Sequence, residues 1–259
     1  MISFLVLPFL TCLALVLIHV YFGSFVLKRG VIFIDLALAQ WAALGYLVAN
    51  WLHIHDPLPL FLMAFGFTVL ASAVLALLKP LFEQTNLQEA VIGVVYILGI
   101  SVAVSLISVT GMEGHHLNEL LAGHLLFVQE SEIISAYALY AFIAACILFF
   151  HAKFNKPTRF WDFMFYVLFG AVVTSSVKLV GVLLVFAYLV LPLLSVWLFT
   201  ERFKTRLIAA WAIGVVATVL GLVTSIWLDI PPSYAVILCL ADIWLGSVIL
   251  KSLLNKKNA

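Results

Sequence analysis

The chain has 259 residues, of which 66% are hydrophobic and only 10% are charged, and its mean hydropathy is +1.24. A water-soluble domain is nearer to half apolar and a quarter charged, so this composition excludes a soluble globular protein and indicates a lipid environment. The net charge of +1 gives no basis for binding nucleic acid, and we expect no such partner.

Long apolar runs follow one another along the chain, separated by short breaks that are polar or contain proline. In lipid, backbone polar groups must pair within the chain, which helices achieve locally, whereas barrel strands would alternate apolar and polar residues. A spanning helix needs about 20 apolar residues, so we predict an all-α, polytopic transmembrane helix bundle of about nine spans, within a range of 8–10. The bundle forms a single domain over residues 1–259. The predicted spans are 4–27, 31–52, 58–78, 90–110, 132–151, 160–177, 179–199, 207–228 and 234–253.

The stretch from residue 162 to residue 199 has few polar breaks. At about 1.5 Å per residue, one helix of this length would reach nearly twice the thickness of the bilayer core. The chain must therefore turn back, and Thr174-Ser175-Ser176-Val177-Lys178 is the expected turn. We count this stretch as two spans, with one span plus a re-entrant segment as the alternative.

The distribution of Lys and Arg predicts the orientation of the chain. If the N-terminus lies outside and the C-terminus inside, every Lys and Arg except Lys178 falls on the inner side, as the positive-inside rule requires. The outer side then holds five of the seven histidines together with several acids. Imidazole and carboxylate groups are ligands for divalent metals such as zinc.

The outer loops supply the first candidate metal ligands. Glu119 lies four residues after His115 and three after His116, so either histidine can share a helix face with it. His53 and His55 are separated by one residue, so they would flank a common site only if this segment of the chain is extended. The equally weighted alternative is that these groups form a solvated rim or dock a partner protein.

Ionisable groups also occur within or at the ends of the predicted spans, where their desolvation makes them functional candidates. Asp35 begins the second span, Asp162 and Lys178 bracket the sixth, and Asp242 lies inside the last one. Asp35 and Asp162 are also consistent with an interfacial position, and Asp242 with a structural hydrogen bond. Gln40 should face protein or a pore, although about 140° of helix rotation separates it from Asp35.

Catalytic motifs are absent from the sequence. It contains no GxxxxGK[ST] phosphate-binding loop, no HExxH and no GxSxG, so we do not predict an enzyme. Any energy that the protein uses must come from a partner subunit or from an ion gradient.

Several segments, in order along the chain, form a recognisable set. The most specific is Lys178-Leu-Val-Gly-Val-Leu-Leu-Val-Phe-Ala-Tyr-Leu-Val-Leu-Pro192, which has a glycine, an apolar run and a proline within one span. The others are Gly23 to Arg29 with Asp35 to Gln40 and Gly45, then Leu120 to Val128, and Asp229-Ile-Pro-Pro-Ser233. Together these segments resemble the membrane permeases of zinc- and manganese-type ABC uptake transporters (the ABC-3 family).

This resemblance implies a homodimeric permease in the bacterial inner (cytoplasmic) membrane, within the lipid bilayer. A cytoplasmic ABC ATPase would bind inside, and a periplasmic or extracellular metal-binding protein would deliver the ion outside. It implies no tightly bound cofactor and a divalent cargo, zinc by preference over manganese or iron. The alternative is a stand-alone, gradient-driven metal transporter.

Two departures from the family pattern accompany the resemblance. The family's second helix carries an aspartate and a histidine four residues apart that handle the metal, and here Leu36 and Gln40 occupy those positions, with Asp35 one residue early. The family also has a cytoplasmic coupling helix between the spans counted here as fifth and sixth. The connection from Lys153 to Arg159 is too short for it. Either docking falls to the loop Lys79 to Glu89 or the loop Glu201 to Arg206, or coupling to the ATPase is weakened or lost.

Overall fold

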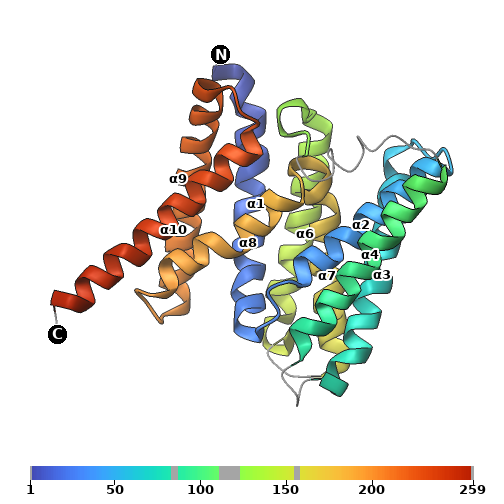
Figure 1. Cartoon of the computed structure of the whole chain (residues 1–259), viewed down its shortest axis with the longest axis horizontal. Helices are drawn as coiled ribbons and strands as arrows, with labels where there is room; N and C mark the ends of the chain where they lie inside the picture. Colours follow the sequence, from blue (N-terminus) through green and yellow to red (C-terminus); the bar gives the residue numbers. More distant parts are fainter. Residues whose placement is uncertain (1, 83–86, 111–122, 155–157, 258–259) are drawn as a thin grey trace. The chain divides into compact units, whose positions relative to one another are not determined.

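The computed structural model describes residues 2–82, 87–110, 123–154 and 158–257 (Figure 1). Within these ranges the chain is helical and contains no strand. Nine α-helices and one 3-10 helix follow in the order α1 (Ile2–Arg29), α2 (Ile34–Trp51), α3 (Pro57–Phe82), α4 (Gln88–Thr110), η2 (Leu125–Phe127), α6 (Glu130–Phe154), α7 (Arg159–Val180), α8 (Val182–Trp197), α9 (Phe203–Leu228) and α10 (Pro232–Lys257).

Each predicted span coincides with one of these helices, and the all-α prediction is confirmed. Seven of the helices are long and apolar enough to cross a membrane. The other two are α8, which has only 16 residues, and α2, which carries Asp35, Gln40 and Asn50 within 18 residues. The count of nine spans and the placement of the two termini therefore remain predictions.

The predicted turn at Thr174–Lys178 is wrong, because α7 continues through it to Val180. The hydroxyls of Thr174, Ser175 and Ser176 donate to carbonyls three or four residues earlier, which lets polar side chains remain inside a buried helix. The break falls instead at Gly181, whose φ of 84° is readily accessible to glycine.

The chain divides into two compact units, each built from separated segments. Unit 1 comprises Met1–Lys28, Leu121–Tyr137 and Leu179–Ala259. Unit 2 comprises Arg29–Leu120 and Ala138–Lys178. The single-domain assignment remains a prediction, and the two units are described separately.

Unit 2 is held together by close backbone contact and by hydroxyl groups. A Cβ at Gly45 of α2 would lie 2.5 Å from the Cα of Ala64 in α3, so only glycine lets these helices approach so closely. Tyr46 Oη donates to the Thr174 carbonyl at 3.1 Å, and the Thr68 and Thr174 hydroxyls lie 2.9 Å apart. These bonds join α2 and α3 to α7.

Unit 1 is held together by the same two kinds of contact, close packing at glycine and hydroxyl hydrogen bonds. Gly221 of α9 packs against the backbone of Val236 in α10, and Gly23 of α1 against Leu189 in α8. The Tyr188 and Thr218 hydroxyls are 2.7 Å apart and link α8 to α9. Figure 1 shows the C-terminal part of α10 extending away from α8 and α9, and most of its apolar side chains are exposed.

We predict that Gly45→Ala lowers the stability of the protein, because the added methyl group overlaps the α3 backbone. The expected loss is about 1–3 kcal/mol. Gly66→Ala in α3 is the matched control, since nothing lies within 4 Å of its added Cβ, and it should be neutral or slightly stabilising. Thermal unfolding in detergent measures both changes, and equal unfolding temperatures would contradict the α2–α3 packing.

Candidate functional site

Three charged residues from distant parts of the sequence meet in unit 2. Asp162, in the first turn of α7, lies 3.1 Å from Arg29 Nη1 through Oδ1 and 2.5 Å from Lys79 Nζ through Oδ2. The Asp162 side chain is only 7% exposed, and the Arg29 guanidinium also lies over the Phe165 ring at 4.2 Å from its centroid. The end of α1, the end of α3 and the start of α7 therefore share one side of unit 2.

A second acidic group holds the turn between α1 and α2. Glu89, in the first turn of α4, accepts hydrogen bonds from the backbone N–H groups of Ile32 and Phe33 at 2.5 and 3.4 Å. This places the start of α4 beside the start of α2. Both acids lie at helix ends that the Lys and Arg distribution predicts to be on the inner side.

Asp35 is fully buried in the first turn of α2. Neither of its carboxylate oxygens has a hydrogen-bond partner among the described residues. An unpaired carboxylate in such surroundings is strongly disfavoured unless a proton or cation accompanies it. Asp35 is therefore the predicted site residue whose environment most clearly calls for a ligand.

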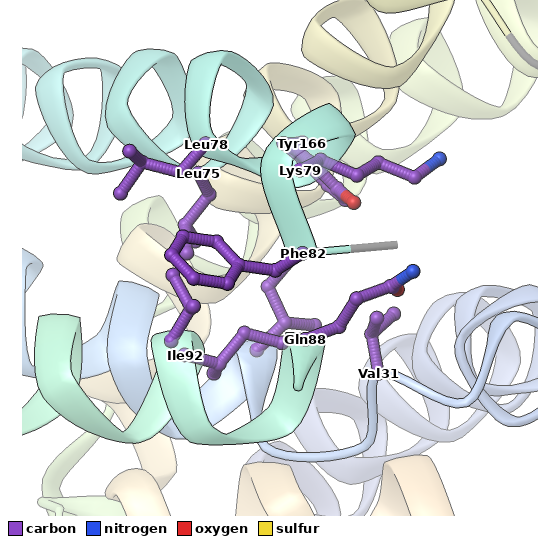
Figure 2. Close-up of a pocket in the computed structure, with 10 residues that line it drawn as sticks. Val31, Leu75, Leu78, Lys79, Phe82, Gln88, Ile92 and Tyr166 are labelled. Atoms are coloured by element: carbon purple, nitrogen blue, oxygen red, sulfur yellow. The ribbon is translucent and has the colours of Figure 1, made fainter. Parts of the chain in front are cut away.

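A small pocket lies next to this position and is lined by residues of α2, α3, α4 and α7. Its lining includes Ile34, the neighbour of Asp35, and Tyr166. In Figure 2 the polar ends of Lys79 and Gln88 lie on the same side of the view, away from the Phe82 ring. The pocket is mainly apolar, and Asp35 does not line it.

Gln40 is also buried, at 5% exposure, but it faces α4. A Cβ placed on Gly99 of α4 would lie 3.3 Å from the Gln40 Cβ. The adjacent Trp41 donates its Nε1–H to the Val95 carbonyl of α4 at 2.9 Å. The two α2 candidates, Asp35 and Gln40, show no direct interaction with each other. This agrees with the angular separation that the sequence predicts.

His53 and His55 follow the end of α2, with their ring centroids 6.4 Å apart and both side chains exposed. About 27 Å of helix separates them from Asp35, so these candidates belong to opposite ends of α2. His115, His116 and Glu119 lie outside the described residues. Among the residues that the structure describes, no three His, Cys, Asp or Glu side chains are grouped closely enough to hold a metal ion.

The sequence reasoning missed His19 in α1, which is fully buried in unit 1. Its Nδ1 lies 2.9 Å from the Leu15 carbonyl, and its Nε2 has no partner among the described residues. Its position inside an apolar run was the available signal. The cluster of Asp162 with Arg29 and Lys79 was also missed, because the sequence left Asp162 as a merely interfacial group.

Comparison with known proteins identifies relatives over nearly the whole chain. Residues 1–251 match the model of the ABC 3 transport family. The Manganese import system permease protein ScaB of Streptococcus gordonii is 22% identical over 238 residues, which cover 87% of this chain and 83% of that protein. The Chelated iron transport system membrane protein YfeC of Yersinia pestis is 26% identical over 181 residues, covering 64% and 60%.

A solved structure shows the same fold. PsaBC from Streptococcus pneumoniae, in complex with Fab, superimposes with a TM-score of 0.76, 20% sequence identity, and coverage of 94% of this chain and 90% of that chain. At this level of identity the likeness concerns the helical architecture.

We predict that Asp162→Asn destabilises the protein by about 3 kcal/mol, because it removes the carboxylate that Arg29 and Lys79 share. Lys79→Gln should cost less, about 1 kcal/mol, since Asp162 keeps its Arg29 partner. Glu201→Gln, at an exposed position, is the control and should change nothing. Thermal unfolding in detergent ranks the three variants, and an Asp162→Asn protein as stable as the control would contradict the cluster.

Proposed function

The chain belongs to the ABC 3 transport family, and from this premise we propose that it is the membrane-spanning permease of an ATP-binding-cassette transporter that imports a divalent metal ion. The observation that carries the proposal is the family match over residues 1–251, which includes every described helix except the last six residues of α10. The two chains of a homodimer would enclose the path, with an ATPase inside and a metal-binding protein outside. This family assignment does not favour the gradient-driven alternative.

The route for the ion would begin at the loops that follow α2 and α4. His53 and His55 are exposed there with Asp56, and His115, His116 and Glu119 would join them as a weak, open site that accepts an ion and releases it. Asp35, with Gln40 farther along α2, would act nearer the opposite end. The buried carboxylate of Asp35, which has no hydrogen-bond partner in the part of the chain that the structure describes, supports this role, because a passing cation would supply a charge partner.

The cargo would be a first-row divalent metal. Histidine ligands at the outer loops suit zinc, which is the preference from the sequence. The relatives are named for manganese and for chelated iron, and carboxylate ligands such as Asp35 suit manganese. The proposal is thus divalent metal import, with zinc, manganese and iron compared directly by experiment.

Coupling to an ATPase would use an inner loop other than the one between α6 and α7. That connection runs only from Phe154 to Arg159. The α8–α9 loop is a well-ordered alternative, since Arg206 donates Nε and Nη2 to the Thr200 carbonyl at 3.1 and 2.6 Å and stacks 3.7 Å from the Trp197 ring centroid. Phe199 and Phe203, both more than two-fifths exposed, flank this loop and would meet the partner.

We predict that deleting the chain from its host abolishes high-affinity uptake of one metal from a panel of zinc, manganese and iron, and that returning the chain restores it. Uptake should stop when ATP is depleted while the membrane potential is maintained. An ATPase subunit should also co-purify with the tagged chain. Uptake that persists without ATP and collapses with the ion gradient would instead establish the gradient-driven alternative.

A further inference from the structure

His19 is the one histidine within the candidate membrane spans that the structure describes. The α1 span runs from Leu5 to Arg29, and His19 lies about 21 Å along the helix from its start and about 15 Å before its end. This places it near the middle of a bilayer core, and its side chain is fully buried. An ionisable group at this depth is a functional candidate, because its desolvation is costly.

The hydrogen bond that His19 makes leaves the lone pair on Nε2 available. Nδ1 lies 2.9 Å from the Leu15 carbonyl, and a carbonyl only accepts, so Nδ1 carries the proton of this bond. In the neutral ring Nε2 is then an acceptor, and it is buried with no hydrogen-bond partner among the described residues. Metal-ligating histidines are held in this way, with the other ring N–H donated to a carbonyl or carboxylate. The His19 ring thus has the arrangement of a metal ligand.

The face of α1 that carries His19 packs against α8. Gly23 lies one turn after His19 on this face, and a Cβ placed there would lie 2.1 Å from the Leu189 carbonyl oxygen. Two turns before His19 on the same face, the Cys12 thiol shares a hydrogen bond with the Tyr188 side chain. His19 lies between these two contacts, so it faces the part of α8 that contains Tyr188 and Leu189.

This part of α8 presents a backbone carbonyl without its usual helical partner. Pro192 has no N–H, so the Tyr188 carbonyl lacks the donor that would lie four residues ahead of it. Around the helix, this carbonyl lies between the Tyr188 side chain and the Leu189 carbonyl, which both contact α1. The His19 Nε2 and the Tyr188 oxygen are both acceptors, so they cannot bond to each other, and a cation or a donor must lie between them.

We propose that His19 Nε2 is a ligand for the transported divalent metal ion at mid-membrane depth, with the Tyr188 carbonyl as the adjacent oxygen ligand. The inference rests on the proposed function and names a further ligand for its cargo. First-row divalent metals accept imidazole nitrogen and carbonyl oxygen, and carbonyls of interrupted helices coordinate ions in other transporters. Two protein ligands completed by water hold an ion weakly enough for it to leave again.

The site is closed in this structure, since His19 is fully buried. An ion therefore reaches it only when α8 moves away from this face of α1. Two features of α8 permit such a movement. The helix follows Gly181, whose φ is 84°, and Pro192 interrupts its hydrogen bonding.

The ligand role is tested by metal uptake at matched membrane abundance. His19→Leu should lower uptake about tenfold or more, although it should unfold at no lower temperature, because it removes a buried acceptor that has no described partner. Thr11→Val is the matched control, since Thr11 is also buried in α1 but donates to the Leu7 carbonyl, and this variant should transport normally. Normal uptake by His19→Leu would overturn the inference and leave a buried water between the two acceptors.

Direct binding is measured with His19→Cys in the purified full-length chain, because a thiolate at this position favours a soft metal such as cadmium. Adding Cd²⁺ should produce a thiolate-to-metal absorption band in the ultraviolet, above the background from Cys12, Cys146 and Cys239. Val20→Cys, fully buried and about 100° farther round α1, is the matched control and should add no band. Equal bands in the two variants, or none in His19→Cys, would overturn the site. If the unsubstituted chain imports no metal, the proposed function fails, while the cadmium band still decides the His19 site.

Discussion

The absence of water from the bilayer core is the constraint on which the rest of this structure depends. Every backbone polar group must find a partner inside the chain, and every charge must reach a helix end or be paired. The helices meet the first requirement, and Asp162, shared by Arg29 and Lys79, meets the second. Asp35, although it lies at the start of α2, is buried with no hydrogen-bond partner among the described residues, and this exception supports the functional proposal.

Lipid also removes the usual drive for helices to associate, because acyl chains are as apolar as leucine. Close packing and hydroxyl hydrogen bonds take its place. Gly45 against α3 and Gly221 against α10 bring backbones into contact, while Thr68, Thr174 and Tyr46 bond across helices. Because these contacts are specific in position, they fix which helix faces are buried inside each unit.

The helices were predictable because apolar length alone decides where a chain crosses lipid. The α7–α8 break was misplaced because a run of hydroxyl residues is typical of a turn. In the structure, the Thr174 and Ser176 hydroxyls instead donate to carbonyls of the same helix.

The Asp162 cluster was not predictable, because Arg29 and Lys79 lie 133 and 83 residues before Asp162 in the sequence, and no local pattern encodes such pairing. Asp35 was named from the sequence, but its burial with no hydrogen-bond partner among the described residues depends on tertiary packing. Of the candidate ligands in the outer loops, the structure describes His53 and His55, whereas His115, His116 and Glu119 lie outside the described residues.

The most direct test of the account is the side of the membrane on which the two ends of the proposed path lie. A membrane-impermeant thiol reagent would be applied to intact cells carrying Asp56→Cys, beside the outer histidines, or Lys204→Cys, in the α8–α9 segment; both positions are exposed. The account predicts labelling of Asp56→Cys in intact cells and of Lys204→Cys only after permeabilisation. Labelling of both from outside, or of Lys204→Cys alone, would contradict it.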